Sequence, residues 1–145
     1  MSMTSVPTFD KTIEKTNRWL DELGQVIDTP DRNHAYLALR AVLHALRDRV
    51  PPDEVTQFSA QLPMLIRGFF FEGWDPSHKP LRYRHKKEFL DQVHREAPAL
   101  ETARLESVVT AVFGLLSREI SRGEAGQLRA LLPAELRELW ALPGL

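Results

Sequence analysis

The sequence predicts an all-α protein, a helical bundle of about eight helices made of two tandem copies of a four-helix unit. Three observations lead to this prediction. The 145-residue chain matches itself at an offset of 70 residues. Apolar residues recur every three or four positions through most of the chain, as they do on the buried face of a helix. No stretch of useful length alternates apolar with polar residues as a strand would.

The internal match is gapless and extends over the whole unit. Nine identities fall between Ala41 and Arg67 when these residues are compared with the positions 70 further on, where ordinary residue usage gives roughly two by chance. The identical residues are Ala41, Val42, Leu46, Glu54, Gln57, Ala60, Leu62, Pro63 and Arg67. Mismatched positions keep their character, as with Trp19 and Phe89. We therefore infer a duplication, in which the two copies should superpose.

The apolar pattern of the first copy predicts four helices. The first covers residues 9–27, and a break follows in which Asp31 can act as the N-cap of the next helix. The second covers residues 39–50, the third residues 55–62, and the fourth residues 65–70. Prolines stand at the later breaks, where they stop one helix and can begin the next.

The second copy repeats this order. Apolar residues at 89–93 open it, and residues 105–116 form its longest buried-looking stretch. Ser121 and Glu124 match the capping box, in which two side chains satisfy each other's free backbone N–H groups at the start of a helix. Pro133 separates the last helix, as Pro63 does in the first copy.

The segment between the copies is rich in proline and basic residues. It covers residues 75–84 and includes Pro76 and Pro80, so it predicts a linker and not a helix. The expected layout is a first helical repeat at residues 1–74, this linker, and a second repeat at residues 85–145. The repeats form either one compact domain or two closely packed subdomains.

Composition excludes several functional classes. The chain contains no cysteine, which rules out disulfides, thiolate catalysis and Cys-based metal sites. Its formal net charge of −1 predicts no general attraction to nucleic acid or to an anionic membrane. Residues 1–10 lack the apolar core of a signal peptide, and no apolar run approaches the roughly 20 residues of a membrane span. We expect a cytoplasmic protein.

Common catalytic and phosphate-binding motifs are also missing from the sequence. It contains no His-Glu-x-x-His, no Gly-x-Ser-x-Gly and no Gly-x-x-x-x-Gly-Lys-Ser/Thr. Asp53 and Glu54 stand at a predicted helix N-terminus, where acidic residues favour the helix dipole and need no catalytic explanation. The sequence therefore predicts no catalytic residue and no cofactor.

Four segments carry a resemblance to a known family, at residues 39–54, 61–68, 72–76 and 89–93. The most specific motifs in them are Leu-Pro-Met-Leu-Ile-Arg-Gly and Glu-Gly-Trp-Asp-Pro. With these motifs the chain resembles the bacterial family called domain of unknown function 2267, over nearly its whole length. The resemblance implies a helical bundle in a bacterial protein. It implies no activity and no catalytic residues.

Two Asp-x-x-His pairs raise the alternative of a metal site. Asp31 precedes His34, and Asp91 precedes His94; residues three apart share a helix face, and helical di-metal sites use the related Glu-x-x-His pattern. The pairs lie 60 residues apart and not 70, so they are not equivalent positions of the repeat. The simpler interpretation is a helix cap and two solvated histidines.

A basic segment near the linker raises the alternative of anion or nucleic-acid binding. Its cations flank Tyr83, and cations interleaved with an aromatic ring are typical of phosphate or single-strand contact. The candidate anion-binding residues are Lys79, Arg82, Arg84, Lys86 and Lys87. The simpler interpretation is a solvated linker, because nucleic-acid-binding domains tend to be basic overall.

Aromatic residues are concentrated just before the linker, at residues 69–71 and at Trp74. Consecutive residues on a helix point about 100° apart, so they cannot all face one core. We predict that Phe69 or Phe70 points inward, and that Phe71 or Trp74 stays partly exposed beside Tyr83. Phe71, Trp74 and Tyr83 are therefore candidate partner-binding residues, since aromatic residues are enriched at interface hot spots.

The function that the sequence favours is a non-catalytic protein-interaction or scaffold module, which binds a protein partner or self-associates. Two alternatives remain open. One is nucleic-acid or anion binding through the basic linker. The other is a metal-dependent enzyme that uses histidines and carboxylates.

Overall fold

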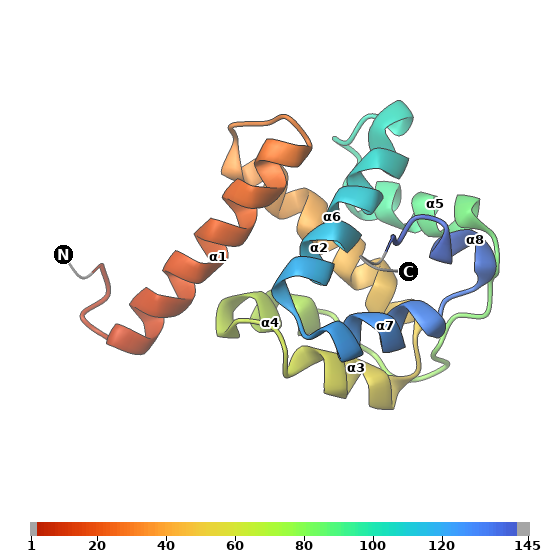
Figure 1. Cartoon of the computed structure of the whole chain (residues 1–145), viewed down its shortest axis with the longest axis horizontal. Coiled ribbons are helices and arrows are strands. Elements are labelled where there is room, and N and C mark those ends of the chain that lie inside the picture. Colours follow the sequence, from red (N-terminus) through yellow and green to blue (C-terminus); the bar gives the residue numbers. More distant parts are fainter. Residues whose placement is uncertain (1–2, 142–145) are drawn as a thin grey trace.

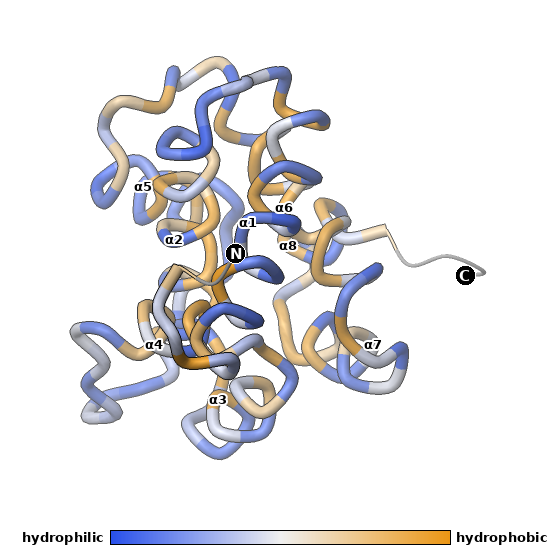
Figure 2. The backbone as a smooth tube through the Cα atoms, turned by 90° about the vertical axis from the view of Figure 1, so that its left-hand side faces the viewer, coloured by the Kyte–Doolittle hydropathy of each residue, from blue (hydrophilic) through white to orange (hydrophobic). Residues whose placement is uncertain are grey.

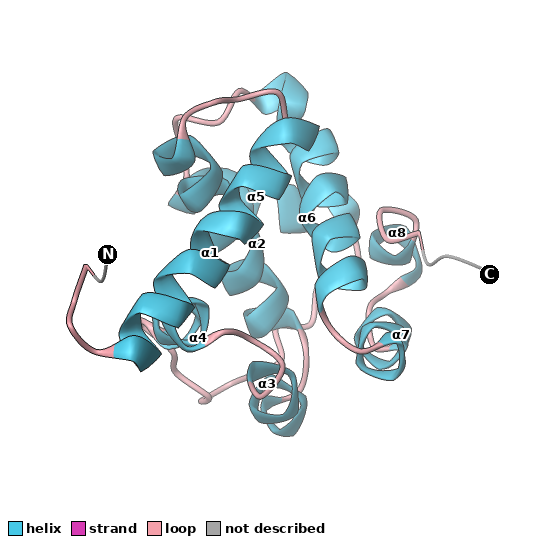
Figure 3. Cartoon of the chain, turned by 60° about the vertical axis from the view of Figure 1, so that its left-hand side comes forward, coloured by secondary structure: helices cyan, strands magenta, loops and turns pink. Residues whose placement is uncertain are grey.

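The computed structural model describes residues 3–141 and is all helical, as predicted. The helices of the first half are α1 (Pro7–Val26), α2 (Arg32–Arg49), α3 (Pro52–Ser59) and α4 (Met64–Phe71). Those of the second half are α5 (Lys86–Glu96), α6 (Leu105–Glu119), α7 (Arg122–Ala130) and α8 (Ala134–Arg137), with a 3-10 turn at Thr102–Arg104 before α6. The described residues include no strand, and Figure 3 shows helices joined by loops.

Helix boundaries in the two halves correspond at the offset of 70. The helices α3 and α7 begin at equivalent residues, as do α4 and α8, while α1 and α5 end at equivalent residues. The halves differ at one end. The equivalent of the start of α1 lies in the linker, and α5 begins nine residues later, because Pro80 and the extended residues after it interrupt the helix. The first nine residues of α1 (7–15) therefore form an extension that the second half lacks.

Two predicted caps can be compared with the structure. The Asp31 side chain accepts a hydrogen bond from the N–H of Asn33 and caps α2. Ser121 caps α7 by accepting from the N–H of Glu124. The return bond of the capping box is not formed, because the Ser121 N–H donates to the side chain of Gln61 at 3.0 Å. The prediction of a reciprocal box was wrong on that point.

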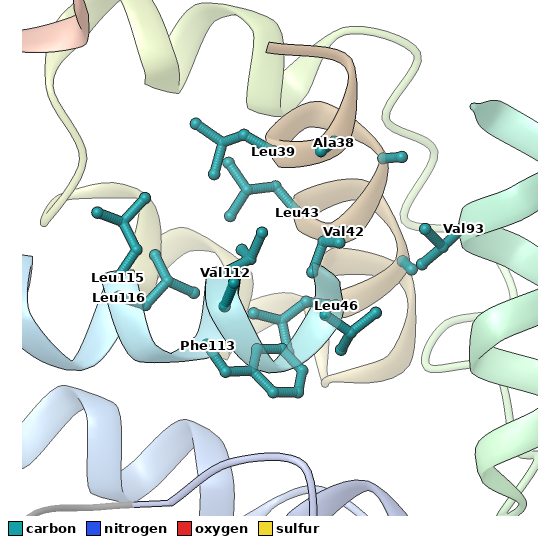
Figure 4. Close-up of a cluster of buried hydrophobic side chains, with 14 of the residues drawn as sticks. Ala38, Leu39, Val42, Leu43, Leu46, Val93, Val112, Phe113, Leu115 and Leu116 are labelled. Atoms are coloured by element: carbon teal, nitrogen blue, oxygen red, sulfur yellow. The ribbon is translucent and has the colours of Figure 1, made fainter. Parts of the chain in front are cut away.

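The core lies mainly between α2 and α6. In Figure 4 the side chains of Leu43 and Leu46 on α2 are directed toward Val112 and Phe113 on α6. Buried apolar residues of both halves form one continuous cluster. In addition, α1 packs on α6 and α5 packs on α2, so the first helix of each half covers the other half.

The remaining helices are amphipathic and cover this core. Figure 2 shows hydrophobic and hydrophilic stretches alternating along the chain, as expected where one helix face is buried. At the C-terminal end Trp140 stacks on Phe113 at 4.5 Å between ring centroids, and its indole N–H donates to Ser117 at 2.7 Å. None of the described helices is both long and apolar enough to span a membrane.

The linker lies against the C-terminal end of α2. The N–H of Leu81 donates to the carbonyl of Asp48 at 2.8 Å, and Arg49 Nε donates to the carbonyl of Tyr83 at 2.9 Å. Since both bonds use backbone atoms of the linker, they fix its path without depending on its side chains.

Candidate functional site

The aromatic residues before the linker divide between core and surface. Phe70 is completely buried, whereas Phe71, Trp74 and Tyr83 are half-buried and pack on the edge of the core. Phe69 is also half-buried and meets the ring of Tyr36 edge-on at 5.2 Å. Part of each predicted partner-binding residue therefore remains accessible.

Cations from α2, and not from the linker, lie over two of these rings. The Arg47 guanidinium is 5.3 Å from the centroid of Trp74, and that of Arg49 is 5.5 Å from the centroid of Tyr83. Arg47 also donates to the carbonyls of Phe70 and Glu72 at 2.8 and 3.0 Å. Both rings are therefore partly covered within the chain, which reduces the apolar surface that they offer to a partner.

Some cations of the basic segment are paired with carboxylates of the chain, and others are not. Lys86 pairs with Glu106 at 3.0 Å, Lys87 pairs with Asp91 at 3.3 Å, and Lys79 makes only a 3.5 Å contact with the carbonyl of Ser77. Arg82 and Arg84 are exposed and form no ion pair with any residue that the structure describes. Burial lowers the pKa of Arg49, and the nearby charge of Arg84 acts in the same direction. The cations of the segment that form no ion pair with a described residue are therefore Lys79, Arg82 and Arg84.

The two Asp-x-x-His pairs are not brought together. His34 precedes the core of α2 and His94 lies on α5, and each is half-buried. Between residues 3 and 141, no group of three or more His, Cys, Asp or Glu residues could hold a metal ion.

A polar cluster that the sequence did not predict joins α2 to the ends of α4 and α5. Arg40 on α2 pairs with Glu96 at 2.9 Å and also with Glu72, and His44 pairs through Nδ1 with Glu96. The Nε2 atom of His44 lies 2.7 Å from the carbonyl of Phe69. These residues line a cavity of about 330 Å³.

In this arrangement both ring nitrogens of His44 are engaged by groups of the chain itself. Both ring nitrogens face oxygen acceptors, and its side chain is only 7% exposed. Two acceptors require two N–H groups on the ring unless Glu96 carries the proton, so no free lone pair is directed into the cavity. The cluster therefore holds three helices together through charge-assisted hydrogen bonds.

A different surface forms a mainly apolar depression. The N-terminal extension of α1 and the exposed side of α4 form a groove of about 350 Å³, which we call the α1–α4 groove. It is lined by Thr4, Phe9, Thr12, Ile13, Met64, Leu65 and Gly68. Phe9 is 49% exposed, Met64 41% and Leu65 44%. In Figure 1 this end of α1 projects beyond the rest of the bundle.

A hydrogen bond joins the two helices that form the groove, and the space above Gly68 is empty. The N–H of Leu65 donates to the hydroxyl of Thr12 at 2.9 Å, which fixes α4 against α1. A side chain added at Gly68 would meet no atom of the chain within 4 Å. Packing within the chain therefore does not require glycine at this helical position, where glycine costs about 0.5–1 kcal/mol relative to alanine.

The second half carries different residues at the positions equivalent to the α4 side of this groove. Ala134, Glu135 and Glu138 stand where the first half has Met64, Leu65 and Gly68. Glu135 accepts from the N–H of Lys86 at 3.1 Å and pairs with His85 at 2.8 Å, which raises the pKa of that histidine. The position that exposes Leu65 in one half is thus occupied in the other by Glu135, a carboxylate whose partners lie within the chain.

Comparison with known proteins identifies the family of the chain. A family model described as "Uncharacterized conserved protein (DUF2267)" matches residues 16–139, so the chain belongs to this family. The match begins just after the nine-residue extension of α1. No curated protein matches the chain.

Proposed function

We propose that the protein is a non-catalytic interaction module that self-associates through the α1–α4 groove. The observation that supports this function is the exposure of Phe9, Met64 and Leu65 around one depression. Exposed apolar side chains gathered around one depression are typical of sites that bind a partner. The His44 cluster, in which every ring nitrogen is occupied, supports a function without catalysis.

The shape of the surface supports a second copy of the chain as the occupant. The groove and the projecting helix that forms one of its walls belong to the same surface. A two-fold related copy can therefore place its Phe9 in the groove while it offers its own groove in return, as in an isologous dimer. The absence of a side chain at Gly68 allows such a close approach to the backbone of α4.

Sedimentation velocity over a range of protein concentrations tests this proposal. We expect a concentration-dependent dimer, and we expect Phe9→Ser and Leu65→Ser each to raise its dissociation constant about tenfold or more. Each substitution removes about 1.5–3 kcal/mol of apolar burial, and a two-fold interface contains the site twice.

Val26→Ser is the matched control, because Val26 lies on the same helix, is 57% exposed and is outside the groove. This variant should dimerise like the unaltered protein, and the far-ultraviolet circular dichroism of all three variants should be unchanged. A protein that is monomeric at every concentration, or a control that weakens the dimer equally, would contradict the proposal. The surface formed by Phe71, Trp74 and Tyr83 stays a prediction, and alanine at Trp74 tests it in the same assay.

A second candidate function is anion binding by the linker, and the unpaired charges of Arg82 and Arg84 favour it. Single-stranded nucleic acid should bind with an affinity that falls steeply with salt, because phosphate contacts release counterions. The double substitution Arg82→Gln with Arg84→Gln should abolish this binding. Lys87→Gln should change the affinity little, because Lys87 is already paired with Asp91. An affinity for single-stranded nucleic acid that does not depend on salt would contradict anion binding by the linker. So would an equal loss of affinity in all of these variants.

A further inference from the structure

The contact between α3 and α7 contains two buried carboxyl groups at equivalent positions of the two halves, Glu54 and Glu124. Each residue is only 5% exposed. Gln127 donates to Glu54 Oε2 at 2.6 Å, and Gln57 donates to Glu124 Oε2 at 2.9 Å. Because Gln57 and Gln127 are themselves equivalent residues, the two hydrogen bonds are reciprocal. Figure 3 shows the two short helices at the same end of the bundle.

One oxygen of each carboxyl group has no donor. Glu54 Oε1 and Glu124 Oε1 are both buried and accept no hydrogen bond from any residue that the structure describes. The two reciprocal glutamine bonds bring the carboxyl groups of Glu54 and Glu124 into one buried cluster between α3 and α7, and Glu124 raises the pKa of Glu54. Two ionised carboxylates this close would repel each other in a site shielded from water. One proton placed between them would satisfy both orphan oxygens at once.

We propose that Glu54 and Glu124 share one proton, and that this shared proton couples α3 of the first half to α7 of the second as a pH-sensitive latch. Protonated, the pair joins the two helices through a carboxyl–carboxylate hydrogen bond in addition to the two glutamine bonds. Deprotonated, it places two like charges in the same contact. Neutral to alkaline pH therefore weakens the contact between α3 and α7.

The surroundings of Glu54 support a proton at this position. Burial, and after it the neighbouring Glu124, raises the pKa of Glu54 from 4.5 to about 7, while the hydrogen bond from the Gln127 amide acts against this shift. The charged groups that act on Glu54 are Glu124 from α7 and Asp53 from its own helix, and both disfavour its ionisation.

The sign of the pH effect follows from the raised pKa. Between about pH 4.5 and about pH 7 the folded protein holds a proton that the unfolded chain has released. The contribution of this proton to the free energy of unfolding is therefore fully present at the acidic end of this window and is lost as the pH rises through it. The folding equilibrium constant should fall by at most about tenfold for each pH unit.

Urea unfolding of the full chain across and above this window tests the proposal. We expect Glu54→Gln to flatten the profile and to be more stable than the unaltered protein above about pH 7, because its amide donates to Glu124 at every pH. Glu124→Gln should behave in the same way. Asp53→Asn, one residue away and exposed, is the matched control: it removes the weakest of the influences on Glu54 and should keep most of the pH dependence.

Hydrogen exchange and carbon-13 NMR of the unaltered protein keep the test valid if a glutamine variant fails to fold. Amides of α3 and α7 should lose protection above about pH 7 while those of α2 and α6 keep it, and one glutamate carboxyl should titrate near neutral pH. A carboxyl pair that titrates entirely below the window, or a control variant with the flattened profile, overturns the proposal. So does a profile that metal chelators shift, which would assign the site to a cation.

Discussion

Two glycines in helices of the first half have opposite surroundings. A Cβ added at Gly24 on α1 would lie 2.7 Å from the carbonyl oxygen of Thr29, closer than real Cβ contacts allow. The same carbonyl belongs to the turn that follows α1, in which the N–H of Thr29 donates to the carbonyl of Gly24 at 2.8 Å. At Gly68 an added Cβ would meet open space. The same substitution should therefore have opposite effects at the two positions.

We expect Gly68→Ala to raise the free energy of unfolding by about 0.5–1 kcal/mol, because alanine restricts the unfolded chain and clashes with nothing. Gly24→Ala should lower it by about 1–3 kcal/mol, since the turn must move to accommodate the methyl group. Urea unfolding at a fixed pH measures both values. A stabilised Gly24 variant would show that the turn after α1 is free to move.

Local sequence signals could predict the helices and most of the breaks between them. Proline and cap residues fixed most breaks correctly, because their effects on backbone geometry and on free N–H groups act within a few residues. The late start of α5 also follows from Pro80, and the linker predicted at residues 75–84 ends two residues before this helix begins.

The candidate sites depended on contacts that no local pattern contains. His44 stands in an apolar helical run, and its partner Glu96 is 52 residues away. A signal was present, because Arg40, His44 and Arg47 follow helical spacing and mark a polar strip on a buried helix. Their partners could not be named without knowing that α5 packs on α2. Glu54 was interpreted from the helix dipole alone, and its burial depends on α7 in the other half.

At the scale of the whole molecule, the crossing of α1 onto α6 and α5 onto α2 makes each half depend on the other. We expect residues 1–74 and residues 75–145, produced separately, each to lack cooperative thermal unfolding, because a unit of this size buries too little surface without its partner. Mixing the two fragments should restore the helical circular dichroism signal. A fragment that melts cooperatively alone would contradict this expectation.

The reciprocal glutamine–glutamate bonds have the form that a symmetric homodimer gives to its contact: each subunit donates what the other accepts. An ancestral single unit that paired with itself would have carried one glutamate and one glutamine and used each twice. Once two units are joined in one polypeptide, assembly no longer depends on concentration, and each unit can accumulate substitutions that its twin does not share. The difference between the charged surface around Glu135 and the apolar surface around Leu65 is an asymmetry that such a covalent fusion would permit.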